Sequence, residues 1–348
     1  MHEAVVALIG RDRPVQLPVW RSFWDQLHAG DLRRGEATAL LASLSTRMPD
    51  PLTLCAFLDS LAERRPVRPA DAFSDAVNIV GTGGGPRTFN ISTAAAFVAA
   101  AMGVRVVKTG SRAYTGSCGS LDLLERLGIA ATTSYEQTQD TLERCGVAFA
   151  GYFVYPAEIA LLARAVVPLD MRRLGSIVNT LGPLLADVPV RAQVTGVSRP
   201  EALQGLRQAA AHVSRATGRT VWLADNDAGA DELLAFTANR VRCYEDGAED
   251  EFTLRPTALG LGPGRLTDLS RPEGGGVQDA VDLFLEVLAG RGTPAATETV
   301  CLNAAALAVA GRLTGDWHEA LRAARSTLHD GTALALIDRL RTREAAHA

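Results

Sequence analysis

Residues 78–93 read Asn-Ile-Val-Gly-Thr-Gly-Gly-Gly-Pro-Arg-Thr-Phe-Asn-Ile-Ser-Thr, and a run of small apolar residues follows them. The apolar pair Ile79 and Val80 predicts a short strand, and the glycines after it predict a tight turn. The alanine-rich segment 94–102 predicts that this turn leads into a helix. Backbone N–H groups of such a turn and the positive end of the helix dipole can together bind an anion. We therefore predict an α/β fold with a phosphate-binding turn at 81–85.

The glycine turn differs from two common nucleotide-binding motifs. The chain has no GxGxxG with an acidic residue on the next strand and no GxxxxGK[ST], so we predict neither a dinucleotide site nor a Walker P-loop. A second polar segment lies close by, because 104–107 predicts a strand and Lys108 falls at its carboxyl end. Ligands of open α/β sheets bind at this edge. Taken alone, Lys108 would be an ordinary surface charge, but beside the glycine turn it favours one site for a phosphorylated ligand.

Composition narrows the class of protein. The chain has 348 residues, of which 47 % are hydrophobic, which suits one large or two medium domains. A net charge of −4 argues against a general nucleic-acid binder, and no long uncharged apolar run predicts a membrane span. The five cysteines are scattered without a CxxC pair, and the six histidines have no zinc-ligand spacing. We expect a cytoplasmic protein that binds neither a membrane nor nucleic acid.

Hydrophobic periodicity changes along the chain. Helical spacing without any strand pattern fills 20–29, 34–47 and 51–64. From residue 77 onward strand patterns alternate with helical ones, which is typical of a mostly parallel sheet. The predicted strands are 78–81, 104–108, 147–154, 190–197 and 220–224. The later predicted helices are 159–167, 178–185, 277–288, 297–314, 317–327 and 331–343, and 260–276 is predicted as a loop.

These patterns predict an α/β fold with a small all-helical N-terminal domain and a mostly parallel central sheet flanked by helices. We place the helical domain at 1–70 and expect 155–187 to join it. The α/β domain, which would bind the phosphorylated ligand, takes 71–154 and 188–348.

In their order along the chain, the motifs resemble the anthranilate phosphoribosyltransferase family, and the similarity covers nearly the whole sequence. The turn 81–84 with 88–93 is similar to the family's loop for its donor, 5-phosphoribosyl pyrophosphate, and 179–183 resembles its Asn-x-Leu-Gly-Pro turn. The segment 302–306 resembles a late helix of the family. The resemblance implies a glycosyltransferase that moves a phosphoribosyl group and releases diphosphate. The donor-binding residues that it implies are Gly81, Thr82, Gly83, Gly84, Thr88, Asn90, Ser92, Thr93, Lys108 and Ser120.

The resemblance also implies Mg²⁺, held by Asp231 and Glu232 with Ser92. An isolated pair of acidic residues would more often be a solvated loop, and serines at helix starts are ordinary caps. The donor is strongly anionic, however, and a divalent cation that bridges its diphosphate to carboxylates would help that group to leave. No nucleophile–base set accompanies the motifs, so we assign no catalytic side chain. Most of the rate would come from charge stabilisation and from holding both substrates in line.

Departures from the family pattern concern the acceptor. The family's Lys-His-Gly-Asn-Arg segment reads Lys-Thr-Gly-Ser-Arg here, and Glu158 stands where the family has the histidine of a His-Pro pair. Gly175 stands where the family has the arginine that meets the carboxylate of anthranilate. The candidate acceptor-site residues are Thr109, Ser111, Arg112, Glu158 and Gly175. Loss of a bidentate carboxylate contact favours a different aromatic or heteroaromatic acceptor. The alternative is anthranilate itself, in tryptophan biosynthesis.

Two further alternatives belong to relatives of the same fold. A pyrimidine-nucleoside-phosphorylase-like enzyme would share a run similar to 108–122, although such enzymes are usually longer. A non-catalytic nucleic-acid-binding relative is disfavoured by the negative net charge. The family resemblance further implies a homodimer formed through the helical domain.

Overall fold

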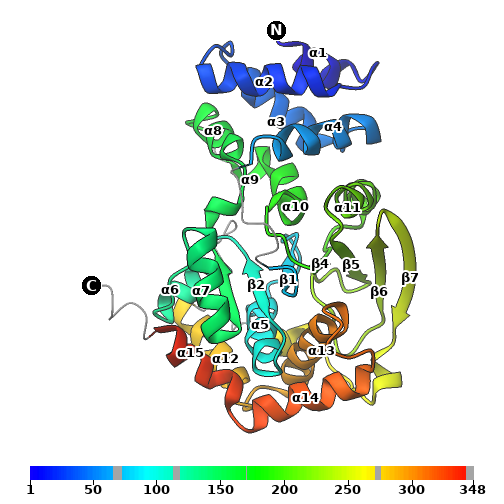
Figure 1. Ribbon diagram of the computed structural model, residues 1–348. Helices are drawn as coiled ribbons and strands as arrows, with labels where there is room; N and C mark the ends of the chain where they lie inside the picture. Colours follow the sequence, from blue (N-terminus) through cyan, green and yellow to red (C-terminus); the bar gives the residue numbers. More distant parts are fainter. Residues whose placement is uncertain (66–72, 113–117, 170, 271–275, 342–348) are drawn as a thin grey trace.

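The structure is a computed structural model that describes residues 1–65, 73–112, 118–169, 171–270 and 276–341 (Figure 1). Four helices form its N-terminal part, at the top of Figure 1: α1 (Glu3–Gly10), α2 (Leu17–Ala29), α3 (Glu36–Thr46) and α4 (Pro51–Ala62). Local chemistry explains the start of α4, since the Asp50 side chain accepts a hydrogen bond from the Thr53 N–H (3.0 Å) and Pro51 takes the first position. The three helices predicted in this region correspond to α2, α3 and α4, whereas α1 was not predicted.

The helices between residues 157 and 185 return to this N-terminal part. They are α8 (Ala157–Ala165), α9 (Met171–Leu174) and α10 (Ser176–Leu185). Leu162 of α8 and Leu181 of α10 belong to the same buried cluster as Trp20 and Trp24 of α2. A side-chain hydrogen bond from Ser45 to the Leu174 carbonyl (2.5 Å) links α3 to α9. Buried side chains of α8 and α10 therefore share a cluster with those of the N-terminal helices.

A seven-stranded sheet forms the centre of the rest of the molecule, in the order β3-β2-β1-β4-β5-β6-β7. The strands are β1 (Val77–Gly81), β2 (Val106–Thr109), β3 (Val147–Ala150), β4 (Ala192–Gly196), β5 (Thr220–Asn226), β6 (Asn239–Glu245) and β7 (Ala248–Leu254). All pairs from β3 to β5 are parallel, and β6 and β7 add antiparallel pairs at one edge. The prediction of a mostly parallel α/β sheet with a helical N-terminal domain is confirmed.

Two details of the strand prediction were wrong. The β6–β7 hairpin was not predicted, although Asp246 and Gly247 form its turn with positive φ values of 49° and 80°. This is the Asp-Gly signal of a tight hairpin, which the charged residues around it obscured. The strand predicted to run to residue 154 ends at Ala150, and a short 3-10 helix, η1 (Tyr152–Val154), follows it.

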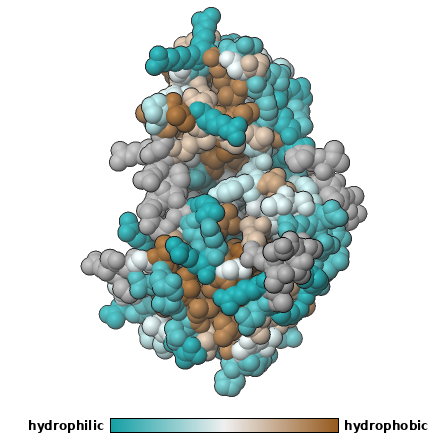
Figure 2. All heavy atoms as spheres, turned by 90° about the vertical axis from the view of Figure 1, so that its left-hand side faces the viewer, coloured by the Kyte–Doolittle hydropathy of each residue, from teal (hydrophilic) through white to brown (hydrophobic). Residues whose placement is uncertain are grey.

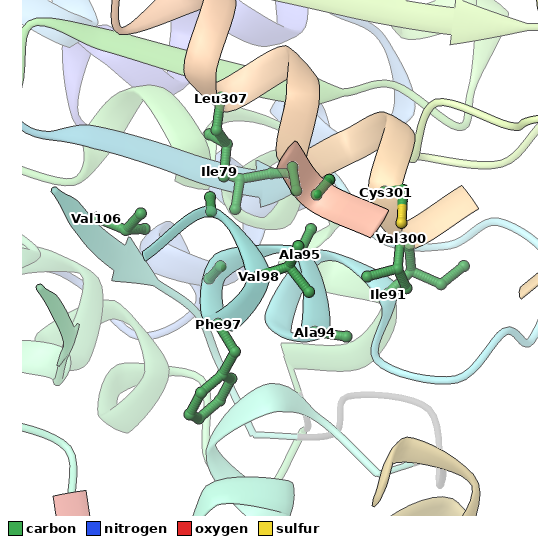
Figure 3. Close-up of a cluster of buried hydrophobic side chains, with 14 of the residues drawn as sticks. Ile79, Ile91, Ala94, Ala95, Phe97, Val98, Val106, Val300, Cys301 and Leu307 are labelled. Carbon is green, nitrogen blue, oxygen red and sulfur yellow. The ribbon is translucent and has the colours of Figure 1, made fainter. Parts of the chain in front are cut away.

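Helices cover the sheet, and one of them is buried on all sides. Helix α5 (Ile91–Ala101) carries the small residues predicted to follow the glycine turn, and Ala94, Ala95 and Phe97 are fully buried. Figure 3 shows Ile79 of β1 and Leu307 of α13 (Pro294–Ala310) close to this helix. A helix apolar on every side must lie inside a core, and small side chains allow the close approach. The packing fixes the N-terminus of α5 at the carboxyl end of β1.

The remaining helices are α6 (Ser120–Arg126), α7 (Tyr135–Cys145), α11 (Leu203–Thr217), α12 (Val277–Leu288), α14 (Trp317–His329) and α15 (Thr332–Arg341). Short 3-10 helices are η2 (Pro200–Ala202), η3 (Pro256–Leu259) and η4 (Leu266–Leu269). Only η4 lies within the loop predicted at 260–276, of which 271–275 lie outside the described residues. Among the described residues, no helix combines the length and the apolar character needed to cross a membrane.

Candidate active site

The glycine turn lies at the carboxyl end of β1 and is packed tightly against the segment after β5. Gly83 and Gly84 have positive φ values of 68° and 84°, a conformation that favours glycine. A methyl group placed on Gly81 would lie 2.1 Å from Oδ2 of Asp231, so only glycine fits there. The Gly83 N–H donates a hydrogen bond to the same carboxylate oxygen (2.7 Å). The turn and the acidic pair are therefore parts of one site.

The start of α5 carries the polar residues predicted to bind the donor. Asn90 is the N-cap residue, and its side-chain amide donates to the Cys118 carbonyl (3.2 Å), next to Gly119 and Ser120. The Thr93 hydroxyl is buried and has no hydrogen-bond partner within the described part of the chain. Thr88 hydrogen-bonds the Glu232 carboxyl. These contacts bring together segments that the sequence separates by up to about 140 residues.

Lys108 is buried near the carboxyl end of β2, next to the start of α5. Its ammonium group donates to the Ile79 carbonyl (2.8 Å) and contacts the Ser92 hydroxyl at 3.3 Å. Burial lowers the pKa of Lys108 to about 8, although the charges of Glu232 and Asp231 act in the opposite direction. The lysine is thus a buried cation whose charge changes near neutral pH, and not the surface charge that the residue type alone would suggest.

Asp231 and Glu232 lie close enough to Lys108 for their charges to act on its ammonium group. Burial raises the pKa of both carboxyls, and for Glu232, whose pKa is raised well above its usual value, the neighbouring Asp231 adds to the effect. Oε2 of Glu232 is buried and has no hydrogen-bond partner among the described residues. A buried carboxylate oxygen without a partner is costly, and a cation would compensate it. The described residues contain no group of three or more His, Cys, Asp or Glu side chains for a metal, so this pair would need oxygen ligands from elsewhere.

Ser120, one of the predicted donor-binding residues, lies at the first turn of α6. Its hydroxyl contacts the Ser111 carbonyl at 3.4 Å, and a methyl group on Gly110 would lie 2.0 Å from it. Thr82 is buried and pairs with Ser198 of the segment after β4, with 3.4 Å between their hydroxyls. Sequence reasoning missed Ser198, which also donates to the Gly83 carbonyl (2.5 Å). Its signal was a serine directly after a buried strand.

The candidate acceptor residues have different surroundings from one another. Thr109 is buried, where its N–H donates to the Asn78 side chain (3.1 Å) and its hydroxyl bonds the Tyr155 side chain. The Arg112 guanidinium is exposed and pairs with Asp122 (3.2 Å) and Glu125 (2.7 Å). Its positive charge is therefore compensated by two carboxylates.

Glu158 is buried at the start of α8, 3 % exposed. Its Oε1 lies 2.8 Å from Nε2 of His28 on α2 and 3.9 Å from the Arg64 guanidinium, whereas Oε2 has no partner among the described residues. Gly175 precedes α10, and a methyl group there would lie 2.7 Å from the Met171 carbonyl oxygen. The backbone at Gly175 thus leaves little room for any side chain.

The side of the molecule that carries α7 and α8 is partly apolar. Figure 2 shows hydrophobic side chains gathered along the middle of this face, on the helical part and on the α/β part. Tyr152, Val167 and Leu169 are exposed large apolar residues in the segments that flank α8. The Tyr152 hydroxyl accepts a hydrogen bond from the Arg112 N–H (3.1 Å), which places this ring beside a candidate acceptor residue.

Comparison with known proteins agrees with these features. The family described as glycosyl transferase family, a/b domain, matches residues 74–334. Anthranilate phosphoribosyltransferase of Deinococcus radiodurans is 34 % identical over 315 residues, which are 89 % of each chain. The chain belongs to the anthranilate phosphoribosyltransferase family. It is accordingly a glycosyltransferase that transfers a phosphoribosyl group, and the family prediction is confirmed.

Other members of the family match the chain over almost its full length. The enzyme of Desulfitobacterium hafniense strain Y51 is 31 % identical and covers 98 % of both chains. The crystal structure of anthranilate phosphoribosyltransferase from Thermus thermophilus has a TM-score of 0.79 at 31 % identity, over 98 % of this chain and 99 % of that one. The enzyme from Saccharomyces cerevisiae in complex with PRPP and Mg has a TM-score of 0.77 over 95 % and 92 %. At 21 % identity this last likeness shows the fold alone.

Proposed function

We propose that the chain takes 5-phosphoribosyl pyrophosphate as its donor, uses Mg²⁺, and transfers the phosphoribosyl group to an aromatic or heteroaromatic acceptor other than anthranilate. The observation that carries the donor assignment is the contact between the glycine turn and Asp231, with Lys108 and the start of α5 beneath it. Backbone N–H groups, a helix N-terminus and a buried ammonium make this a site for a polyanion. A relative in this family is described in complex with PRPP and Mg, which supports the same ligands here.

The acidic pair fits Mg²⁺. Both side chains offer oxygen ligands, and the unpartnered Oε2 of Glu232 lacks the partner that a cation would supply. Asp231 and Glu232, with the Ser92 hydroxyl, would hold the ion, and donor phosphates and water would complete its ligands. When bound, the ion supplies Lewis-acid stabilisation to the leaving diphosphate.

The reaction breaks the bond between ribose C1 and diphosphate and forms a bond from C1 to the acceptor nucleophile. The N-terminus of α5 would stabilise negative charge that grows on the leaving group, and Lys108 would pair with a phosphate of the donor. Rate acceleration would also come from holding the acceptor in line with C1. These groups would bind the substrates and stabilise the charge of the leaving diphosphate. We assign no side chain to covalent catalysis.

The proposal of an acceptor other than anthranilate depends on the charges of the candidate acceptor-site residues. Gly175 provides no side chain, Arg112 is paired with two carboxylates, and Glu158 is a buried acid. A carboxylate-bearing acceptor would meet no free cation at these three positions, and an unpaired buried charge is expensive. The apolar, aromatic surface around Tyr152 favours a planar acceptor without a negative charge.

Anthranilate remains the second candidate, because relatives with 31 to 36 % identity carry the name anthranilate phosphoribosyltransferase. Two acceptors of matched shape separate the proposals: anthranilate and its neutral analogue 2-aminobenzamide. Diphosphate release from the donor with Mg²⁺ would be measured for both, followed by a panel of heterocyclic amines. We expect 2-aminobenzamide to be the better of the two. A kcat/KM of about 10⁴ M⁻¹s⁻¹ or more for anthranilate would restore the second candidate.

Donor binding is tested separately by calorimetry. Failure of the chain to bind phosphoribosyl pyrophosphate at millimolar donor and Mg²⁺ would overturn the donor assignment, whatever the acceptor.

A further inference from the structure

An arginine that the family motifs do not include lies against the donor turn. A methyl group placed on Gly84 would come within 3.1 Å of both Nε and Nη2 of Arg199. Arg199 follows β4, the strand next to β1 in the sheet, so the two segments meet at the same edge. The guanidinium therefore lies at van der Waals distance from the part of the turn that has no side chains of its own.

The backbone next to Arg199 is fixed to the turn. The Ser198 N–H donates to the Thr82 hydroxyl (3.3 Å), and the Ser198 hydroxyl donates to the Gly83 carbonyl (2.5 Å). Pro200 follows, and a residue before proline is restricted to extended backbone, which Arg199 adopts with φ −112° and ψ 108°. Hydrogen bonds on one side and proline on the other hold Arg199 in position.

The charge of Arg199 is available. In the part of the chain that the structure describes, the Arg199 guanidinium makes no ion pair or hydrogen bond, and the residue is exposed; its backbone carbonyl accepts from the Ala202 N–H (3.1 Å). It lines a cleft of about 870 Å³ between the helical part and the α/β part, together with Arg47, Met48, Ile177, Thr180 and Gln208. Likewise, the N–H groups of Gly84 and Gly85 donate no hydrogen bond to any described residue. Free N–H groups and a free guanidinium at one turn are complementary to an anion.

We propose that Arg199 binds the diphosphate of the donor and so acts as a further donor-binding residue; this rests on the proposed function. Diphosphate is favoured over the 5-phosphate because the adjacent Gly83 N–H already contacts Asp231, and an ion on that carboxylate would bring diphosphate to this turn. Guanidinium groups form bidentate hydrogen bonds with phosphate oxygens, which lysine cannot reproduce. Arg199 would therefore add both affinity and orientation to the leaving group.

The test measures binding of two fragments of the donor to the full chain by calorimetry: diphosphate with Mg²⁺, and ribose 5-phosphate. Arg199→Ala should weaken diphosphate binding by about ten- to a hundredfold, as expected for a lost charge-assisted hydrogen bond, and leave ribose 5-phosphate binding unchanged. Arg199→Lys should fall between Arg199→Ala and the unmodified chain. Arg322→Ala, on the exposed side of α14, is the matched control and should change neither affinity.

The outcomes separate the two proposals. Suppose that the unmodified chain binds the whole donor. This inference is then overturned if Arg199→Ala leaves diphosphate affinity unchanged, or if it weakens the binding of both fragments equally. Absence of donor binding in the unmodified chain would overturn the proposed function and the inference together. Thermal unfolding of each variant shows whether the fold is retained.

Discussion

The buried carboxyl of Glu232 is the feature of this site that points most directly to cation binding. Its carboxyl has a raised pKa because of burial, and one oxygen has no partner among the described residues. Nothing in the packing of a stable core requires such an arrangement, since a glutamine of the same shape would cost less to bury. This arrangement supports our proposal that Glu232 is a cation ligand, which would destabilise the fold until the cation binds.

Glu232→Gln should accordingly raise thermal stability without Mg²⁺ and abolish Mg²⁺-dependent donor binding. A group whose pKa is raised on folding stabilises the fold at low pH, and that contribution is lost as the pH rises through the folded value, so Glu232 should lower stability at alkaline relative to acidic pH. Thermal unfolding at pH 8 and donor calorimetry measure the two effects. Glu136→Gln, an exposed acid in the first turn of α7, is the control. Wild-type donor affinity in Glu232→Gln would refute the metal assignment.

Lys108 gives the site a pH dependence. With a pKa of about 8, the ammonium is charged at pH 7 and largely neutral at pH 9.5. Binding of ribose 5-phosphate without Mg²⁺ should therefore weaken as the pH rises through about 8, since the phosphate itself does not titrate in that range. The variant Lys108→Met should bind weakly and show no such change. A flat profile in the unmodified chain would indicate that Lys108 does not meet the phosphate.

The glycine turn has close neighbours at Gly81, Gly84 and Gly85. Gly81→Ala should displace Asp231, because the new methyl group would lie 2.1 Å from Oδ2 and 2.7 Å from Cγ of that residue. We expect a loss of stability of about 1–3 kcal/mol and a marked loss of Mg²⁺-dependent donor binding. Gly315→Ala, where a methyl group meets nothing within 4 Å, is the matched control. Equal behaviour of the two variants in unfolding and calorimetry would show that the turn tolerates a side chain.

Elements with local signals were predictable from the sequence. Glycines, a cap residue and an alanine-rich run specify the turn and α5 within consecutive residues, and β1, β2, β4 and β5 lie within or beside the predicted strands. The β6–β7 hairpin was missed because its strands alternate charged residues with few apolar ones. At the site, the pairing of Arg112 with Asp122 and Glu125 joins side chains on separate segments, which no local sequence pattern predicts. The contact of Arg199 with Gly84 joins positions that only the sheet order brings together.

At the scale of the whole molecule, α8 and α10 connect the helical part to the sheet, and Glu158 belongs to this connection. Its contacts reach His28 on α2 and Arg64 after α4, so it links α8 to the N-terminal helices. The structure also shows that replacing Gly175 by the arginine of the family pattern would meet a steric obstacle. An arginine at Gly175 would force the Met171 carbonyl to move, so a single Gly175→Arg exchange should reshape the start of α10 before it could bind a carboxylate.

Glu158→Gln offers a cleaner test of acceptor charge. Glutamine keeps the shape of the side chain and a hydrogen bond to His28, and removes one buried negative charge. If Glu158 faces the acceptor, the ratio of kcat/KM for anthranilate to that for 2-aminobenzamide should rise roughly tenfold in Glu158→Gln. A change of this size is expected when a unit negative charge about 10 Å from the acceptor carboxylate is removed, at an effective dielectric constant of about 20. Asp25→Asn, an exposed carboxylate that pairs with Arg64 on the same part of the molecule, should leave the ratio unchanged. Steady-state kinetics with both acceptors decides the matter. An unchanged ratio in Glu158→Gln would place this carboxylate outside the acceptor site and leave it a purely structural link between α8 and α2.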